Sequence, residues 1–184
     1  MDVDQNKVML GRWDGWYKNL KKSGSFRYGN TASYRLAGEF LVDMKDVEDW
    51  GCGAGGFRRH YKGKYTGIDG SHNPFVDKIE DLRNYASRPE GIIMRHVLEH
   101  NYDWKKVLAN AINSFQKKLC IIIFTPFSNE TKEIAQNAKH GVDVPDISFE
   151  REELEWFFQG LKYDLETIKS KTAYGVEHIY YIKR

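Results

Sequence analysis

The longest uninterrupted apolar run of the chain extends from Leu119 to Phe124 and limits what the chain can fold into. It is far shorter than the roughly 20 residues that a membrane-spanning helix requires, so we expect no membrane-spanning segment. Because the run is continuously apolar rather than alternating, it predicts a strand buried on both faces. Such strands are typical of a parallel sheet covered by helices, so the run predicts an α/β fold.

Shorter patterns alternate between strand and helix along the chain. Further strands are predicted at Asp46 to Trp50, Tyr65 to Asp69 and Gly91 to His96. Helical spacing and start signals predict helices from a Thr31 cap to Leu41, at Trp104 to Phe115, and at Phe149 to Leu154, which has acids in its first turn.

The last two patterned segments, Tyr163 to Lys169 and Val176 to Lys183, alternate and predict an antiparallel pair. The whole pattern predicts a Rossmann-like, doubly wound, mostly parallel sheet with a C-terminal antiparallel hairpin strand. A length of 184 residues suits a single domain. Within it, residues 1–30, rich in Trp, Tyr, Lys and Gly, are expected to form an N-terminal cap on a core of residues 31–184.

Charge and cysteine content exclude several classes of protein. Lys and Arg number 28 and Asp and Glu 26, so a net charge of +2 does not by itself predict a nucleic-acid partner. Two cysteines are too few to predict a disulfide framework. The first residues are acidic and polar, so no secretory leader is expected, and a cytoplasmic location is predicted.

A glycine cluster directly after the strand at Asp46 to Trp50 carries the functional signal. Gly51, Gly53 and Gly55 alternate, which lets the backbone pass close beneath a ligand, and a helix that followed would offer its N–H groups to an anion. A second strand ends at Asp69, whose carboxylate can accept both hydroxyls of a ribose.

In these residues the chain resembles the class I S-adenosylmethionine-dependent methyltransferases, from about Val47 to Phe127. The pattern Asp49-x-Gly51-x-Gly53-x-Gly55 resembles the family's first motif, and Val97-Leu98-Glu99-His100 a run common after its fourth strand. The resemblance implies that the glycines pass under the methionine part of S-adenosylmethionine, that Asp69 binds the ribose, and that Asp81-Leu82 meets the adenine. The cofactor-binding residues implied in this way are Asp49, Gly51, Gly53, Gly55, Asp69, Gly70, Asp81, Leu82, Arg95 and His96.

Two other chemistries fit parts of the same sequence. Gly51, Gly53 and Gly56 satisfy the dinucleotide fingerprint of nicotinamide enzymes, with Asp69 as its acid. Asp81-Leu82 and the Leu98-Glu99-His100 run favour methyl transfer instead. His96-x-x-Glu99-His100 also matches a zinc-hydrolase pattern, but His96 is expected at the end of a strand, outside any helix, so no metal is predicted.

If the methyl acceptor is a hydroxyl, a histidine is the expected general base. His100 and His140 are the catalytic candidates, because both should lie near the carboxyl edge of the sheet, where open α/β sheets bind ligands. The predicted acceptor is a small molecule or a sugar-containing metabolite, in a pocket formed by the N-terminal cap and Ser128 to Ser148.

Alternatives to that acceptor remain open. Arg58, Arg59, Lys62 and Lys64 form a basic run that would serve an RNA or RNA-cap methyltransferase, although such runs are more often solvated surface. A binding module without turnover is the third possibility. Trp13, Trp16 and Tyr17 are expected to pack the N-terminal helix, with a lid or a stacking wall over the pocket as the alternative. Trp50 is expected in the core or in a pocket wall. The sequence makes no prediction of oligomeric state.

Overall fold

The computed structural model describes residues 10–23, 31–138 and 142–184. A seven-stranded sheet forms its centre, with strand order β3-β2-β1-β4-β5-β9-β8. Strands β1 to β5 pair in parallel, and the β9–β8 hairpin continues the sheet antiparallel to β5. The strand bounds are β1 Asp46–Trp50, β2 Lys64–Asp69, β3 Lys78–Ile79, β4 Gly91–Arg95, β5 Lys118–Ile123, β8 Lys162–Lys169 and β9 Val176–Lys183. The predicted Rossmann-like sheet with its C-terminal hairpin is confirmed.

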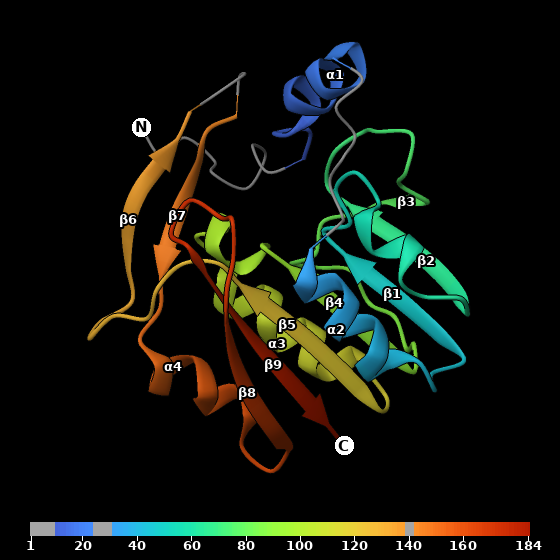
Figure 1. The fold of residues 1–184 in the computed structure, drawn as a ribbon, viewed down its shortest axis with the longest axis vertical. Helices are drawn as coiled ribbons and strands as arrows, with labels where there is room; N and C mark the ends of the chain where they lie inside the picture. The colour runs from blue at the N-terminus through green and yellow to red at the C-terminus, as the bar shows by residue number, and fades with distance from the viewer. Residues whose placement is uncertain (1–9, 24–30, 139–141) are drawn as a thin grey trace.

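Helices cover both faces of the sheet (Figure 1). They are α2 (Ala32–Leu41) on one face, α3 (Trp104–Ser114) on the other, and the short α4 (Arg151–Glu155) with the following 3-10 turn η5 (Trp156–Phe158). Thr31 caps α2 as predicted, because its side chain accepts a hydrogen bond from the backbone N–H of Tyr34.

The apolar run of β5 is buried on both sides, as its composition predicts. Leu119, Ile121 and Ile123 belong to the core cluster that contains α3, whereas Cys120 and Ile122 belong to the cluster beneath α2. Both clusters are fully buried along β5, which explains why no polar residue alternates with the apolar ones.

Two further elements lie beyond the carboxyl ends of the parallel strands (Figure 1). One is α1 (Asp14–Ser23), and the other is a separate antiparallel pair of β6 (Lys132–Asn137) and β7 (Val144–Ser148). The sequence did not predict this pair, because β6 is largely exposed and polar and lacks the apolar alternation of a half-buried strand. Together α1 and β7 bring aromatic and polar side chains to the edge of the sheet where ligands of such folds bind.

Three local predictions need correction. The helix expected after the glycine cluster is a single 3-10 turn, η2 (Gly56–Arg59), so the N-terminus of a long helix does not face the pocket. The strand predicted to end at His96 ends at Arg95, because His96 has a positive φ of 57° and leaves the ladder. The helix predicted from Phe149 begins at Arg151.

Candidate active site

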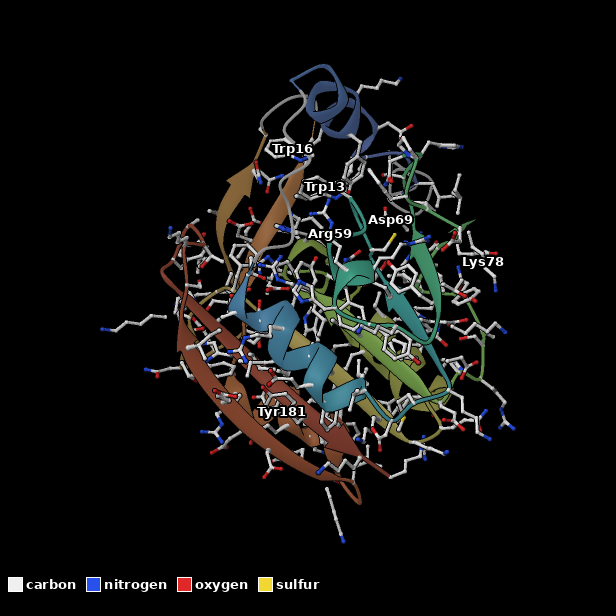
Figure 2. All side chains as sticks on the ribbon, turned by 45° about the vertical axis from the view of Figure 1, so that its right-hand side comes forward. Trp13, Trp16, Arg59, Asp69, Lys78 and Tyr181 are labelled. Carbon is white, nitrogen blue, oxygen red and sulfur yellow. The ribbon has the colours of Figure 1, made fainter. Side chains whose placement is uncertain are left out.

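A single cleft at the carboxyl edge of the sheet gathers most of the predicted site residues. It encloses about 1100 Å³ of space, counting the part open to solvent. α1 lies over one side of it, and Figure 2 shows Trp13, Trp16 and Asp69 at this end of the molecule. The predicted residues that line it are Gly51, Gly53, Asp69, Gly70, Asp81, Leu82, Arg95, His96 and His100.

Gly51 and Gly53 form the floor of the cleft, and both have a backbone conformation that favours glycine. Their φ angles are 76° and 51°, in the left-handed region that other residues rarely adopt. The N–H groups of Gly51 and Cys52 both donate to the carbonyl of Ile68 in β2, which ties the loop to the next strand. A Cβ on Gly51 would lie 2.4 Å from Cγ2 of Val97, so the loop and the end of β4 approach as closely as a glycine permits.

Asp69 is held in place by the loop that it faces. Its Oδ2 accepts from the N–H of Gly53 and its Oδ1 from that of Ser71, both at 2.9 Å. Burial raises the pKa of Asp69 to about 6, and the backbone hydrogen bonds oppose that rise. Each carboxylate oxygen can accept a second hydrogen bond, and Asp69 lines the cleft, so the side chain has the capacity to bind a vicinal diol.

Asp49 and Gly55 lie outside the lining of the cleft. Asp49 is 1% exposed and accepts a hydrogen bond of 2.8 Å from the hydroxyl of Tyr65, and burial raises its pKa to about 7. Gly55 packs against Phe75, whose Cβ would lie 3.0 Å from a Cβ at this position. Neither residue lines the cleft in this structure, so their contact with a cofactor stays a prediction.

Asp81 follows β3 and reaches the cleft with its charge already paired. Arg83 donates to both of its carboxylate oxygens at 2.6 to 3.0 Å, and this lowers the pKa of Asp81. Arg83 also bonds Asp103 at the start of α3. The pairing fixes the segment that carries Leu82 against the cleft.

Arg95 and His96 meet a residue that sequence reasoning missed, Glu177 of β9. Glu177 is 1% exposed, and its Oε1 accepts from Arg95 at 2.8 Å, from Ser33 at 2.9 Å and lies 2.8 Å from Nε2 of His96. Burial lowers the pKa of His96 to about 4, although Glu177 opposes that shift. An acid beside apolar residues in a terminal strand was the available signal.

His100 is held by a second residue that the sequence did not single out. Its Nδ1 lies 2.9 Å from the carbonyl oxygen of Pro145 and 3.3 Å from Oδ1 of Asp146, both in β7. A carbonyl and an ionised carboxylate only accept hydrogen bonds, so Nδ1 carries the proton. The lone pair of the neutral ring is then on Nε2, to which no side chain or backbone group of the described residues is hydrogen-bonded.

The environment of His100 is aromatic as well as charged. The rings of Trp13 and Phe124 lie 5.2 and 5.4 Å from its ring. Burial would lower the pKa of His100, but the carboxylate of Asp146 beside it and the charge of Glu99 outweigh that effect and raise the pKa. The second catalytic candidate, His140, lies outside the described residues.

The remaining aromatic predictions separate into core and cleft. Trp50 is fully buried and donates from Nε1 to Glu48, so it belongs to the core. Trp13, Trp16 and Tyr17 line the cleft, which fits the alternative of a wall over the pocket better than packing alone.

The zinc pattern at His96 to His100 is not assembled as a metal site. Glu99 points inward, where its Oε1 accepts from the N–H of Phe124, and His96 is bonded to Glu177. Among the residues that the structure describes, no group of three or more His, Cys, Asp or Glu side chains is placed to hold a metal ion. In the same part of the chain, no helix combines the length and the apolar character needed to cross a membrane.

Comparisons with known proteins identify the class. Residues 30–168 match the family model described as a methyltransferase domain, and the chain belongs to this family of S-adenosylmethionine-dependent enzymes. No curated protein sequence gives a match. The family assignment decides against the nicotinamide alternative.

Solved structures share the fold at low sequence identity. Magnesium protoporphyrin IX methyltransferase from Synechocystis, with bound S-adenosylmethionine, is 13% identical with a TM-score of 0.56, over 92% of this chain and 80% of that one. The complex between the Haloferax volcanii Trm112 methyltransferase activator and a methyltransferase shows 12% identity and a TM-score of 0.60, over 94% of this chain and 95% of that one. Mitomycin 7-O-methyltransferase shows 14% identity and a TM-score of 0.56, over 100% of this chain and 62% of that one.

Proposed function

We propose that the chain transfers a methyl group to a hydroxyl of a small molecule or of a sugar-containing metabolite. The observation that carries the proposal is the state of His100 in the lining of the cleft, with Nδ1 bonded to the Pro145 carbonyl beside the Asp146 carboxylate and the lone pair on Nε2. In this proposal residues 31–184 are the cofactor-binding core and residues 1–30 its cap, together one methyltransferase domain. The family match, which begins at residue 30, supports that division.

The cleft fits S-adenosylmethionine by the chemistry of its lining. Asp69 offers carboxylate acceptors to the ribose hydroxyls, beside a floor where Gly51 leaves no room for a Cβ. We assign Asp81, Leu82 and Gly70 to the adenosine end, and Gly53, Arg95 and His96 to the methionine end. Asp49 and Gly55 support the loop. When bound, the cofactor supplies a methyl group that its sulfonium already activates.

His100 acts on the acceptor in this proposal. With the cofactor bound, the acceptor oxygen would take the methyl group, the electron pair of the old bond would stay on the cofactor's sulfur, and Nε2 of His100 would receive the hydroxyl proton. A positioned general base of this kind contributes about 10²–10⁴-fold to rate. His140, outside the described residues, stays the alternative base.

The size and walls of the cleft support a small acceptor. Trp13, just before α1, Trp16 in α1 and Val144 in β7 line it, so the walls of the cleft beside His100 include two elements beyond the sheet. Aromatic faces such as that of Trp13 suit the apolar side of a ring or of a sugar. Two of the similar structures are named for small-molecule acceptors, a magnesium porphyrin and a mitomycin.

The RNA alternative rests on the basic segment from Arg58 to Lys64. Arg58 is paired with Asp77 at 2.6 Å and stacks over Tyr65, so part of the charge of this segment is already satisfied. RNA binding that weakens steeply with salt would support this alternative.

Binding of the cofactor is tested first, by calorimetry with S-adenosylmethionine and its demethylated product. Asp69→Asn removes the charge from the proposed ribose contact, and we expect affinity to fall about 10–100-fold, since charge-assisted hydrogen bonds contribute roughly 1.5–3 kcal/mol. Asp164→Asn, on the exposed face of β8, is the matched control. Unchanged affinity in Asp69→Asn would overturn the placement of the cofactor.

Turnover is tested next, with a panel of hydroxylated small molecules as acceptors and His100→Gln as the variant. Methyl transfer that falls at least about 10²-fold in His100→Gln, with cofactor affinity unchanged, supports the proposed base. Wild-type turnover in this variant overturns it. Cofactor binding with no methyl transfer to the panel or to RNA would favour a binding module without turnover.

A further inference from the structure

Asp146 stands out because it is buried beside His100 although the two are far apart in sequence. Asp146 is 8% exposed and lies in β7, outside the sheet that carries the cofactor-binding loop. Its Oδ1 has no hydrogen-bond partner among the described residues. This oxygen forms an ion pair with Nδ1 of His100, at 3.3 Å. Its Oδ2 accepts a hydrogen bond of 2.9 Å from the hydroxyl of Tyr174.

These contacts join three separate elements at one point. His100 ends the 3-10 turn η3 (Leu98–His100), Asp146 belongs to β7, and Tyr174 lies in the turn between β8 and β9. Tyr174 therefore binds one oxygen of the Asp146 carboxylate, and the other oxygen of that carboxylate faces the imidazole of His100. The order Tyr174–Asp146–His100 runs from the surface toward the cleft, where His100 is part of the lining.

We propose that Asp146 is a positioning residue that fixes the Nδ1–H tautomer of His100 and stabilises its protonated form, with Tyr174 orienting the carboxylate. This rests on the proposed function, in which Nε2 of His100 takes the acceptor proton. A carboxylate behind the imidazole keeps the lone pair directed at the substrate and offsets the positive charge that appears when the proton arrives. Without it, only the Pro145 carbonyl holds the proton on Nδ1, and the tautomer with the proton on Nε2, which cannot act as a base, becomes more populated.

The charged groups around His100 agree with this role. Asp146 faces it from β7, Glu99 from its own turn, and His96 from the end of β4; the rings of Trp13 and Phe124 complete the surroundings without charge. Burial disfavours ionisation of Asp146, but His100 and Tyr174 outweigh it and lower the pKa of its carboxyl. Asp146 is therefore ionised over the range in which His100 titrates, and the pKa of His100 lies above its ordinary value.

The first test reads the imidazole itself and needs no acceptor. Nitrogen-15 NMR of the histidine rings, assigned with His100→Gln, gives the tautomer and the pKa of His100 in the wild type, Asp146→Asn and Asp146→Ala. We expect the Nδ1–H tautomer in the wild type, a lower pKa in Asp146→Asn, and a mixture of tautomers in Asp146→Ala. Asp164→Asn, which removes one carboxylate on exposed β8, should change neither quantity.

The second test follows kcat against pH with the acceptor found in the screen. Activity requires unprotonated Nε2, so kcat should fall as pH drops through the pKa of His100. In Asp146→Asn we expect this limb at lower pH and kcat at its plateau reduced about 10²-fold, with cofactor affinity unchanged. Tyr174→Phe should give a smaller loss in the same direction, which keeps the test open if Asp146 variants fold poorly.

The outcomes separate the two proposals. If His100→Gln loses turnover while Asp146→Asn keeps the wild-type tautomer, pKa and pH profile, the positioning role is overturned and the general base stands. If His100→Gln keeps wild-type turnover, the proposed base fails, and the role of Asp146 fails with it even where NMR shows the two groups coupled.

Discussion

Replacing Gly51 with alanine introduces two separable costs in the loop beneath the cleft. The φ of 76° places a Cβ in the left-handed region, which costs about 1–2 kcal/mol. The new Cβ would also lie 2.4 Å from Cγ2 of buried Val97, and overpacking of this kind costs about 1–3 kcal/mol. We expect Gly51→Ala to lower the free energy of unfolding by about 2–5 kcal/mol, or roughly 4–20 °C in Tm for a chain of this length.

Gly160→Ala separates the two costs. Gly160 has nearly the same φ, 80°, but nothing lies within 4 Å of a Cβ there. This variant should therefore lose only the backbone term, about 1–2 kcal/mol. The difference between the two variants measures the contact with Val97.

The assay is urea unfolding of both single variants, of Val97→Ala and of the double variant Gly51→Ala/Val97→Ala. Removal of Cγ2 relieves the clash, so the double variant should lose less than the sum of the single losses, by about 1–3 kcal/mol. Equal losses in Gly51→Ala and Gly160→Ala, together with additive losses in the double variant, would refute the claim that close approach requires glycine at residue 51.

Three further predictions concern stability. Burial raises the pKa of Glu99 to about 7, above the ordinary 4.5, so its protonated form stabilises the fold by about 3 kcal/mol below pH 4.5, and this contribution is lost as pH rises to 7. Urea unfolding at pH 5 and pH 7.5 should show a smaller decline of stability with pH in Glu99→Gln than in the wild type. An equal decline in the two proteins would contradict this prediction. Thr31→Ala removes the cap of α2 and should cost about 1 kcal/mol by the same assay, whereas Thr31→Ser should cost little; equal costs would count against the cap. Fully buried Leu108→Ala should cost about 2–5 kcal/mol and exposed Lys106→Ala less than about 0.5, a contrast that calorimetric unfolding measures and that similar values would disprove.

Local chemistry let the sequence predict most of the sheet. The continuous run of β5 reports burial on both faces, and β1 and β9 have the bounds that were predicted for them. Thr31 signals the start of α2 through a contact within four residues of chain. The glycine cluster identified the floor of the cleft because glycine adopts a left-handed φ far more readily than other residues do.

The partners of the two cleft histidines were not accessible in the same way. Glu177 reaches His96 from 81 residues away and Asp146 reaches His100 through β7, whose pairing with exposed β6 follows no strong alternation. The sequence shows that acids are present but not which imidazole each one faces, because that depends on how the chain crosses the sheet.

Trp50 shows the same difference between what the sequence and what the tertiary structure reveal. The sequence left Trp50 between core and pocket wall, and packing against Tyr85 with a bond to Glu48 places it in the core. By itself the sequence determined the class of enzyme, most strands of the sheet and the glycine loop that lines the cleft, all of which depend on neighbours along the chain. Only the tertiary structure decided which side chains close the cleft and which nitrogen of His100 carries the proton, because those depend on contacts between elements that the sequence keeps far apart.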